Sequence, residues 1–145
     1  MRIVTLLLTG RMRTNKKQIF SLKDRIKSFT YAFSGLKNLW QEEHNFRIHI
    51  FAAILAIVAG VIFNISVIEW LAVILSVGLV LTAEIINTSI EKLSGFVSPE
   101  KHETIKKVKD LAAAGVLVAA TSALITGLII FLPKLLTLLS LNIEL

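Results

Sequence analysis

The sequence contains no cysteine, only two prolines, one tyrosine and three histidines. Without cysteine, disulfide and thiol chemistry are excluded. The histidines His44, His49 and His102 do not share the spacing of a metal-binding motif. No glycine-rich phosphate-binding loop is present, so the chemistry of P-loop enzymes and of protein kinases is also excluded.

Apolar residues are abundant instead. They make up 54% of the 145 residues, and the mean hydropathy is +0.74. They come in long blocks, which predicts an all-α integral membrane protein of one domain. The net charge of +6 could suggest nucleic acid, but the positions of the charges favour a membrane protein and no nucleic-acid partner.

The order of amphipathic and apolar segments along the chain predicts an N-terminal amphipathic surface helix followed by three transmembrane helices. We expect a disordered tail over residues 1–18 and a single domain over residues 19–145, with the surface helix at about 19–44. The spans are expected at about 46–63, 67–93 and 103–132, with a turn at 64–66. Gly95 is expected to end the second helix and Pro133 the third. An amphipathic helix docked on protein is the alternative to the surface helix.

The basic residues predict how the chain crosses the membrane. Ten of the 16 Lys and Arg residues precede Ile48, and five lie between Lys92 and Lys109. The turn between the first two spans has none, and Lys134 alone follows the third span. The positive-inside rule then places the N-terminus and the second connection of this multi-pass protein in the cytoplasm.

Two acidic residues stand at the end of the second apolar block. Glu84, Asn87 and Glu91 follow one another at i, i+3 and i+7, so they project from one helix face. A carboxylate within a membrane helix is costly, by a few kcal/mol, and is therefore a functional candidate. Such a face suits a metal ion, a proton to be removed, or both.

These residues alone leave three classes of protein open. A lipid-modifying enzyme would use one carboxylate as a base, others to hold Mg²⁺ and a nearby lysine to neutralise phosphate. A small transporter would use an intramembrane carboxylate to carry an ion or a proton. A structural membrane protein would use Glu84 only as a hydrogen-bond partner between helices.

Three segments carry a resemblance to a known family. Glu84-Ile85-Ile86-Asn87-Thr88-Ser89-Ile90-Glu91 resembles the signature of the small prokaryotic diacylglycerol kinases, a family that also contains the undecaprenol kinases. Lys109-Asp110-Leu111-Ala112-Ala113-Ala114-Gly115-Val116 is similar to the start of the family's third span. Asn45-Phe46-Arg47-Ile48-His49, after Glu42-Glu43, is similar to the start of its first. The resemblance covers roughly residues 29–132.

The resemblance implies an activity and a site. It implies phosphorylation of a lipid alcohol by ATP with Mg²⁺, the lipid being diacylglycerol or, as the alternative, undecaprenol. It also implies a homotrimer with active sites shared between subunits. The implied roles are Glu84 as catalytic base, Glu43 and Glu91 as metal ligands that also bind ATP, Tyr31, Glu100, His102, Lys109 and Asp110 as further ATP-binding residues, and Asn87 and Ala113 as residues lining the site.

Some of these assignments have alternatives, and the sequence departs from the family at two places. Glu42 could substitute for Glu43, and His102 could be an ordinary loop residue. The family usually has an aspartate four residues after the second signature glutamate, where this chain has Gly95. Counting without gaps places Asp24 where the family has an arginine in its surface helix, so no role is assigned there.

Overall fold

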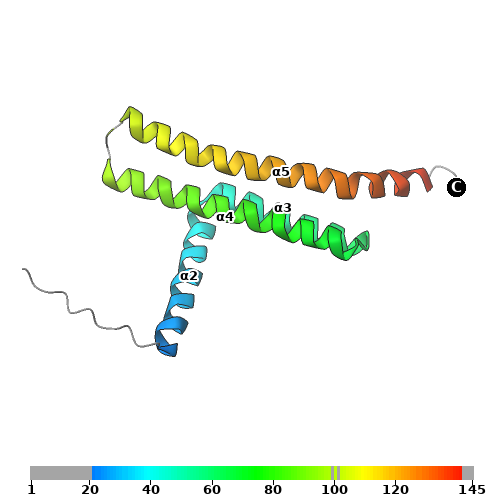
Figure 1. Ribbon diagram of the computed structural model, residues 1–145, viewed down its shortest axis with the longest axis horizontal. Helices are drawn as coiled ribbons and strands as arrows, with labels where there is room; N and C mark the ends of the chain where they lie inside the picture. Colours follow the sequence, from blue (N-terminus) through cyan, green and yellow to red (C-terminus); the bar gives the residue numbers. More distant parts are fainter. Residues whose placement is uncertain (1–20, 99, 101, 142–145) are drawn as a thin grey trace, which may run out of the picture. The chain divides into compact units, whose positions relative to one another are not determined.

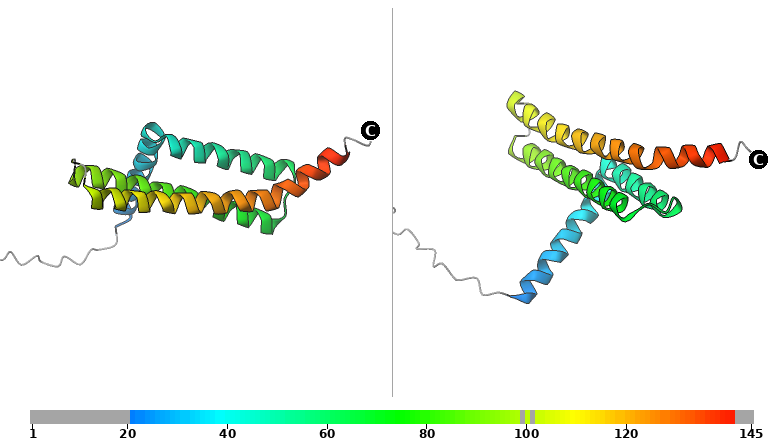
Figure 2. Two further views of the ribbon diagram at one scale, coloured as in Figure 1. Left: turned by 90° about the horizontal axis from the view of Figure 1, so that it is seen from above. Right: turned by 45° about the vertical axis from the view of Figure 1, so that its right-hand side comes forward.

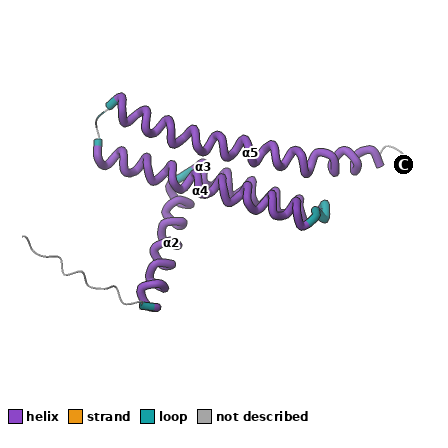
Figure 3. The backbone as a smooth tube through the Cα atoms, in the orientation of Figure 1, coloured by secondary structure: helices purple, strands orange, loops and turns teal. Residues whose placement is uncertain are grey.

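The chain is almost wholly helical in the part that its computed structural model describes, which is residues 21–98, 100 and 102–141. The described helices are α2 (Leu22–Glu42), α3 (His44–Ile62), α4 (Val67–Val97) and α5 (Glu103–Leu141), joined by short loops (Figures 1 and 3). Contacts divide the chain into two units, Met1–Ser34 and Gly35–Leu145. The all-α architecture expected from the sequence is confirmed, while the tail predicted over residues 1–18 lies outside the described residues.

The first unit contains the N-terminal part of α2. Its large apolar side chains recur at helical spacing and are exposed, among them Leu22, Ile26, Phe29 and Phe33. These four positions are separated by four, three and four residues, so they form one stripe along the helix. The helix is therefore amphipathic, as predicted, and its position on a membrane surface remains a prediction.

The second unit contains three helices that are long and apolar enough to cross a membrane. Helix α4 packs against both α5 and α3, and Figures 1 and 2 show the three running side by side. Many large apolar side chains of these helices are exposed, whereas Glu84, Asn87, Thr88 and Ser94 are buried. Burial of polar groups beneath an apolar surface is the arrangement expected of a protein whose solvent is lipid.

A tight turn connects α3 and α4. Asn64 has a left-handed backbone with φ of 46°, a conformation in which asparagine is among the more tolerated residues. The Ser66 side chain then accepts the N–H of Glu69 at 3.3 Å, and the Glu69 carboxylate accepts the N–H of Ser66 at 2.6 Å. This capping box fixes the first residue of α4.

Gly60 allows α3 to approach the side chain of Trp70 closely. A Cβ atom added at Gly60 would lie 2.7 Å from the indole Cη2 and 3.1 Å from Ile65 Cδ1. We therefore expect Gly60→Ala to lower the thermal unfolding temperature in detergent by several degrees, because a rigid ring must move. Gly78→Ala, where an added Cβ meets nothing within 4 Å, is the control. Equal unfolding temperatures for the two variants would contradict the close contact.

Two predicted helix ends are wrong. Helix α4 continues past Gly95 to Val97, because Gly95 does not adopt the left-handed conformation that ends a helix. Helix α5 continues through Pro133 to Leu141, and Figure 2 shows its axis changing direction towards that end. Pro133 removes one hydrogen bond only, and the next residue, Lys134, is held to Glu69 at 3.0 Å.

Candidate functional site

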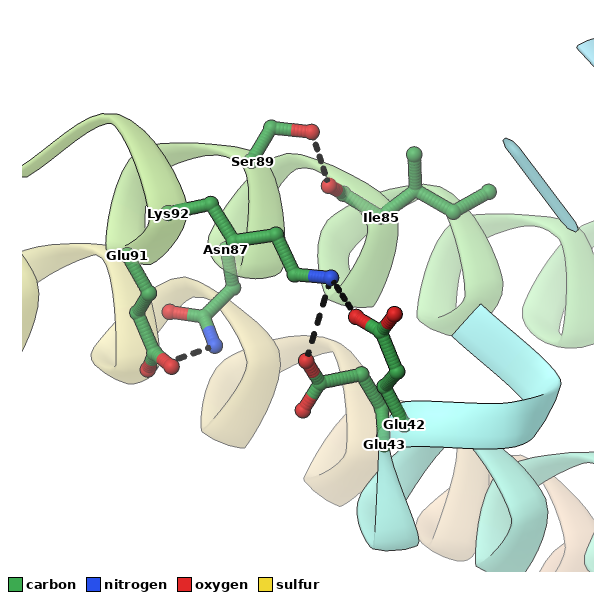
Figure 4. A network of polar contacts seen from close by, with 7 residues as sticks. All are labelled: Glu42, Glu43, Ile85, Asn87, Ser89, Glu91 and Lys92. Carbon is green, nitrogen blue, oxygen red and sulfur yellow. Dashed lines mark hydrogen bonds and ion pairs between the residues drawn. The ribbon is translucent and has the colours of Figure 1, made fainter. Parts of the chain in front are cut away.

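Three polar side chains of α4 line one buried face. Glu84 is 2% exposed and Asn87 is 7% exposed. Asn87 Nδ2 donates a hydrogen bond of 3.1 Å to Glu91 Oε1, one helical turn further on (Figure 4). Among the described side chains, Glu84 Oε2 and Asn87 Oδ1 are buried without a hydrogen-bond partner. Two buried oxygens without donors point to a site that a ligand completes.

A second pair of carboxylates, Glu42 and Glu43, lies where α2 ends and α3 begins, a junction that we call the elbow. Glu43 has an extended backbone and is the N-cap of α3, but its side chain makes no capping hydrogen bond. Lys92 of α4 forms an ion pair with Glu42 and lies 3.8 Å from a Glu43 oxygen (Figure 4). Lys92 is not among the predicted site residues, because its position next to Glu91 in the sequence does not indicate that it faces another helix.

The charges of this region act on Glu84 together. Glu84 interacts electrostatically with Glu43, Glu91 and His49. His49 comes from α3 and is half-buried. Its imidazole is close enough to the Glu84 carboxylate on α4 to interact with it electrostatically. Glu43 and Glu91 are therefore both close enough to Glu84 to interact with it electrostatically, and Asn87 lies on the same face of α4.

An apolar groove of about 490 Å³ runs between α3, α4 and α5. His49 and Val80 are part of its lining, and Val80 precedes Glu84 by one helical turn. Small side chains keep it open, namely Ala52, Ala56 and Ala59 from α3 with Ala120, Ala123 and Gly127 from α5. The groove is therefore an apolar space in the spanning region whose lining comes within one helical turn of Glu84.

A second, polar hollow of about 590 Å³ lies where α4 ends and α5 begins. It is lined by the remaining predicted nucleotide residues of this unit, Glu100, His102, Lys109 and Asp110. Asp110 accepts a hydrogen bond of 2.5 Å from Lys106, and His102 Nδ1 accepts the N–H of Thr104 at 3.2 Å. Gly95 also lines this hollow, at the position where the family has an aspartate.

The structure does not bring all the predicted residues together. No hydrogen bond or ion pair joins the described side chains of the hollow to the carboxylate group on α4. Ala113 follows Asp110 by one turn and is exposed. Tyr31 belongs to the first unit, where Lys27 Nζ lies 5.8 Å from the centre of its ring.

The carboxylates of this region supply some of the ligands that a hard divalent cation needs, and not a complete set. Within the described residues, no three histidine or acidic side chains converge on a preformed metal site. Glu43 and Glu91 offer carboxylate oxygens, and Asn87 Oδ1 is a buried oxygen without a donor. Mg²⁺ is usually held by one or two carboxylates, with water and substrate phosphates as the other ligands, so this donor set suits it.

The chain is similar to known proteins over the same helices. The sequence model described as prokaryotic diacylglycerol kinase matches residues 30–131. Undecaprenol kinase of Bacillus subtilis (strain 168) is 38% identical over 109 residues, covering 75% of this chain and 89% of that protein. Diacylglycerol kinase of Escherichia coli (strain K12) is 35% identical over 105 residues, covering 72% and 86%.

A third relative, diacylglycerol kinase of Synechocystis, is 37% identical over 112 residues, which is 77% of this chain and 64% of that protein. The matched region contains the buried carboxylate face, the elbow and the polar hollow. The family's name describes an enzyme that transfers phosphate to a lipid, and the three apolar helices place such an enzyme in a membrane. The chain therefore belongs to the prokaryotic diacylglycerol kinase family and is a membrane lipid kinase.

Proposed function

We propose that this lipid kinase phosphorylates diacylglycerol to phosphatidic acid with ATP and Mg²⁺. The observation that carries the proposal is the position of Glu84, an acidic side chain that is 2% exposed and lies one helical turn from an apolar groove. A lipid alcohol has the matching form, with one hydroxyl group on an apolar body. Undecaprenol has it too, and the Bacillus subtilis relative is named for that substrate.

The groove supports entry of the lipid from the side. Its lining is almost wholly aliphatic or aromatic, and the small residues of α3 and α5 leave room for a hydrocarbon chain. A chain lying there would direct its polar end towards Glu84 and His49. The hydroxyl group would then meet the buried carboxylate without leaving the membrane.

The carboxyl group of Glu84 supplies the base. In the proposed reaction it takes the hydroxyl proton, the lipid oxygen bonds to the γ-phosphorus, and the bond from that phosphorus to the departing ADP oxygen breaks. Glu43 and Glu91 would hold Mg²⁺, which when bound neutralises charge on the phosphates. Asn87 keeps the Glu91 carboxylate in place through its amide. Positioning and charge neutralisation would supply most of the rate.

The polar hollow supports nucleotide binding from the water side. Lys109 lines it and forms no ion pair with any described residue, so its ammonium group is available for a phosphate. We place Glu100, His102 and Asp110 around the same nucleotide. Because no polar contact joins this hollow to the α4 carboxylates among the described residues of one chain, we propose a homotrimer in which neighbouring subunits complete each site.

The basic residues at the same end of the helices support a cytoplasmic site. Lys106 and Lys107 are exposed near the hollow, where they would face an anionic leaflet. The N-terminus would share this side, in the inner membrane of a bacterium. ATP is then available to the site directly.

One experiment tests the activity and the substrate together. The purified enzyme in detergent micelles is given ATP labelled in its γ-phosphate and either diacylglycerol or undecaprenol. Labelled phosphatidic acid is the expected product, and its formation should require Mg²⁺. Label in undecaprenyl phosphate alone would transfer the proposal to the second substrate. Solute flux in liposomes without label transfer would indicate a transporter instead.

Gly95 offers a gain-of-function prediction. A Cβ atom added there meets nothing within 4 Å, and the residue lines the polar hollow beside Lys109 and Asp110. We expect Gly95→Asp to fold normally and to lower the Mg²⁺ concentration needed for half-maximal turnover by about threefold to tenfold, since it adds an anionic oxygen. Gly95→Asn, which adds the same volume without charge, is the control. Identical Mg²⁺ dependence in all three proteins would remove Gly95 from the metal environment.

A further inference from the structure

The elbow between α2 and α3 is fastened to α4 by one lysine. Lys92 forms an ion pair with Glu42, and its Nζ lies 3.8 Å from Glu43 Oε1. Figure 4 shows Lys92 extending towards these two carboxylates, while Asn87 and Glu91 face each other on the same helix. These are the polar side-chain contacts between the elbow and α4 in the described part of the chain.

Glu43 needs such a contact because its own helix does not orient it. An N-cap side chain usually accepts a backbone N–H of the first helical turn, which fixes its direction. The Glu43 carboxylate makes no such bond, and it is 28% exposed. Its direction is therefore set by the elbow backbone and by Lys92.

We propose that Lys92 is a positioning residue of the lipid kinase, which holds the elbow against α4 so that the carboxylates of Glu43 and Glu91 can bind one metal ion. The inference rests on the proposed metal-binding role of these two glutamates. Lys92 itself needs no contact with the metal or the nucleotide. Its effect passes through Glu42 and Glu43.

Two simpler roles predict different results. In the first, the ion pair between Lys92 and Glu42, whose side chains are 49% and 57% exposed, contributes nothing measurable to metal affinity, and neither Lys92→Met nor Glu42→Gln changes that affinity. A lysine can also act on a metal through its charge alone. In that case Lys92→Met would tighten metal binding by removing a positive charge, and Glu42→Gln would weaken it by removing a negative charge. Positioning predicts that both changes weaken binding, because both release the elbow.

The test measures Mn²⁺ binding in the presence of a non-hydrolysable ATP analogue, by electron paramagnetic resonance of the free ion, with the full-length protein in detergent. We expect Lys92→Met and Glu42→Gln each to raise the dissociation constant by about threefold to fivefold, the range of a half-exposed ion pair. The exchanged pair, Lys92→Glu with Glu42→Lys, should restore most of the affinity. Lys107→Met breaks the exposed pair between Lys107 and Glu103 and serves as the control.

Steady-state kinetics of the Lys92→Met variant provide a second test. If Lys92 positions a metal ligand, Lys92→Met should raise the KM for MgATP more than it lowers kcat, and helical content by circular dichroism should not change. Opposite signs for the two single variants, no effect of either, or no recovery in the exchanged pair would each overturn the proposal. If Mn²⁺ does not bind the wild-type protein, or if Glu91→Gln binds it normally, the metal site itself is wrong.

Discussion

Glu84→Gln is expected to lower lipid phosphorylation by about 10³-fold, within the range that a general base contributes. Glutamine has nearly the same shape but does not accept a proton from the lipid hydroxyl. The side chain is 2% exposed, and a neutral amide is easier to bury than a carboxylate, so the fold should remain stable. The measurement is transfer of labelled phosphate from ATP to lipid, with circular dichroism and oligomer mass measured alongside.

Glu69→Gln is the matched control for this variant. Glu69 lies on the same helix and caps its first turn, remote from the carboxylate group. We expect turnover to stay within about twofold of wild type, because glutamine can also serve at this position of a capping box. Near-normal turnover of Glu84→Gln would refute the assignment of Glu84 as the base.

Glu91→Gln is expected to weaken divalent-metal binding by about 10²-fold. The glutamine carbonyl can still accept the hydrogen bond from Asn87, so the local structure should be kept and the lost charge is the main change. The measurements are Mn²⁺ affinity and the Mg²⁺ concentration that supports half-maximal turnover. Excess Mg²⁺ should restore part of the activity, which it would not do for Glu84→Gln. Unchanged metal dependence would exclude Glu91 as a ligand.

The positions of the helices could be predicted because apolar blocks of this length have one stable solution in a bilayer. Their ends were harder to predict. Gly95 and Pro133 are signals that end helices in water, where released backbone groups find new partners easily. In this chain α4 continues past Gly95 and α5 continues past Pro133. The ion pair between Lys134 and Glu69, next to Pro133, depends on packing between α4 and α5. The packing between these two helices cannot be predicted from the residues next to Gly95 or Pro133.

The contacts of the carboxylate face on α4 could also be predicted only in part. The contact between Asn87 and Glu91 follows from their spacing on one helix, and the structure contains it. The approach of His49 and Lys92 depends on how α3 and the elbow meet α4, which no spacing along the chain records. The resemblance to a family supplied Glu43, Lys109 and Asp110 as candidates, and the structure places Glu43 with Glu84 but the other two in a separate hollow.

The capping box fixes the residue at which α4 begins, and therefore the distance along the helix from that residue to Glu84. Ser66 is the N-cap of α4, and Glu84 comes 18 residues later, a distance of about 27 Å along a helix axis. The hydrocarbon layer of a bilayer is about 30 Å thick. With the turn before α4 at one surface of the bilayer, the length of helix between Ser66 and Glu84 sets the depth of the carboxyl group, and bilayers built from shorter or longer acyl chains would move that group towards water or away from it.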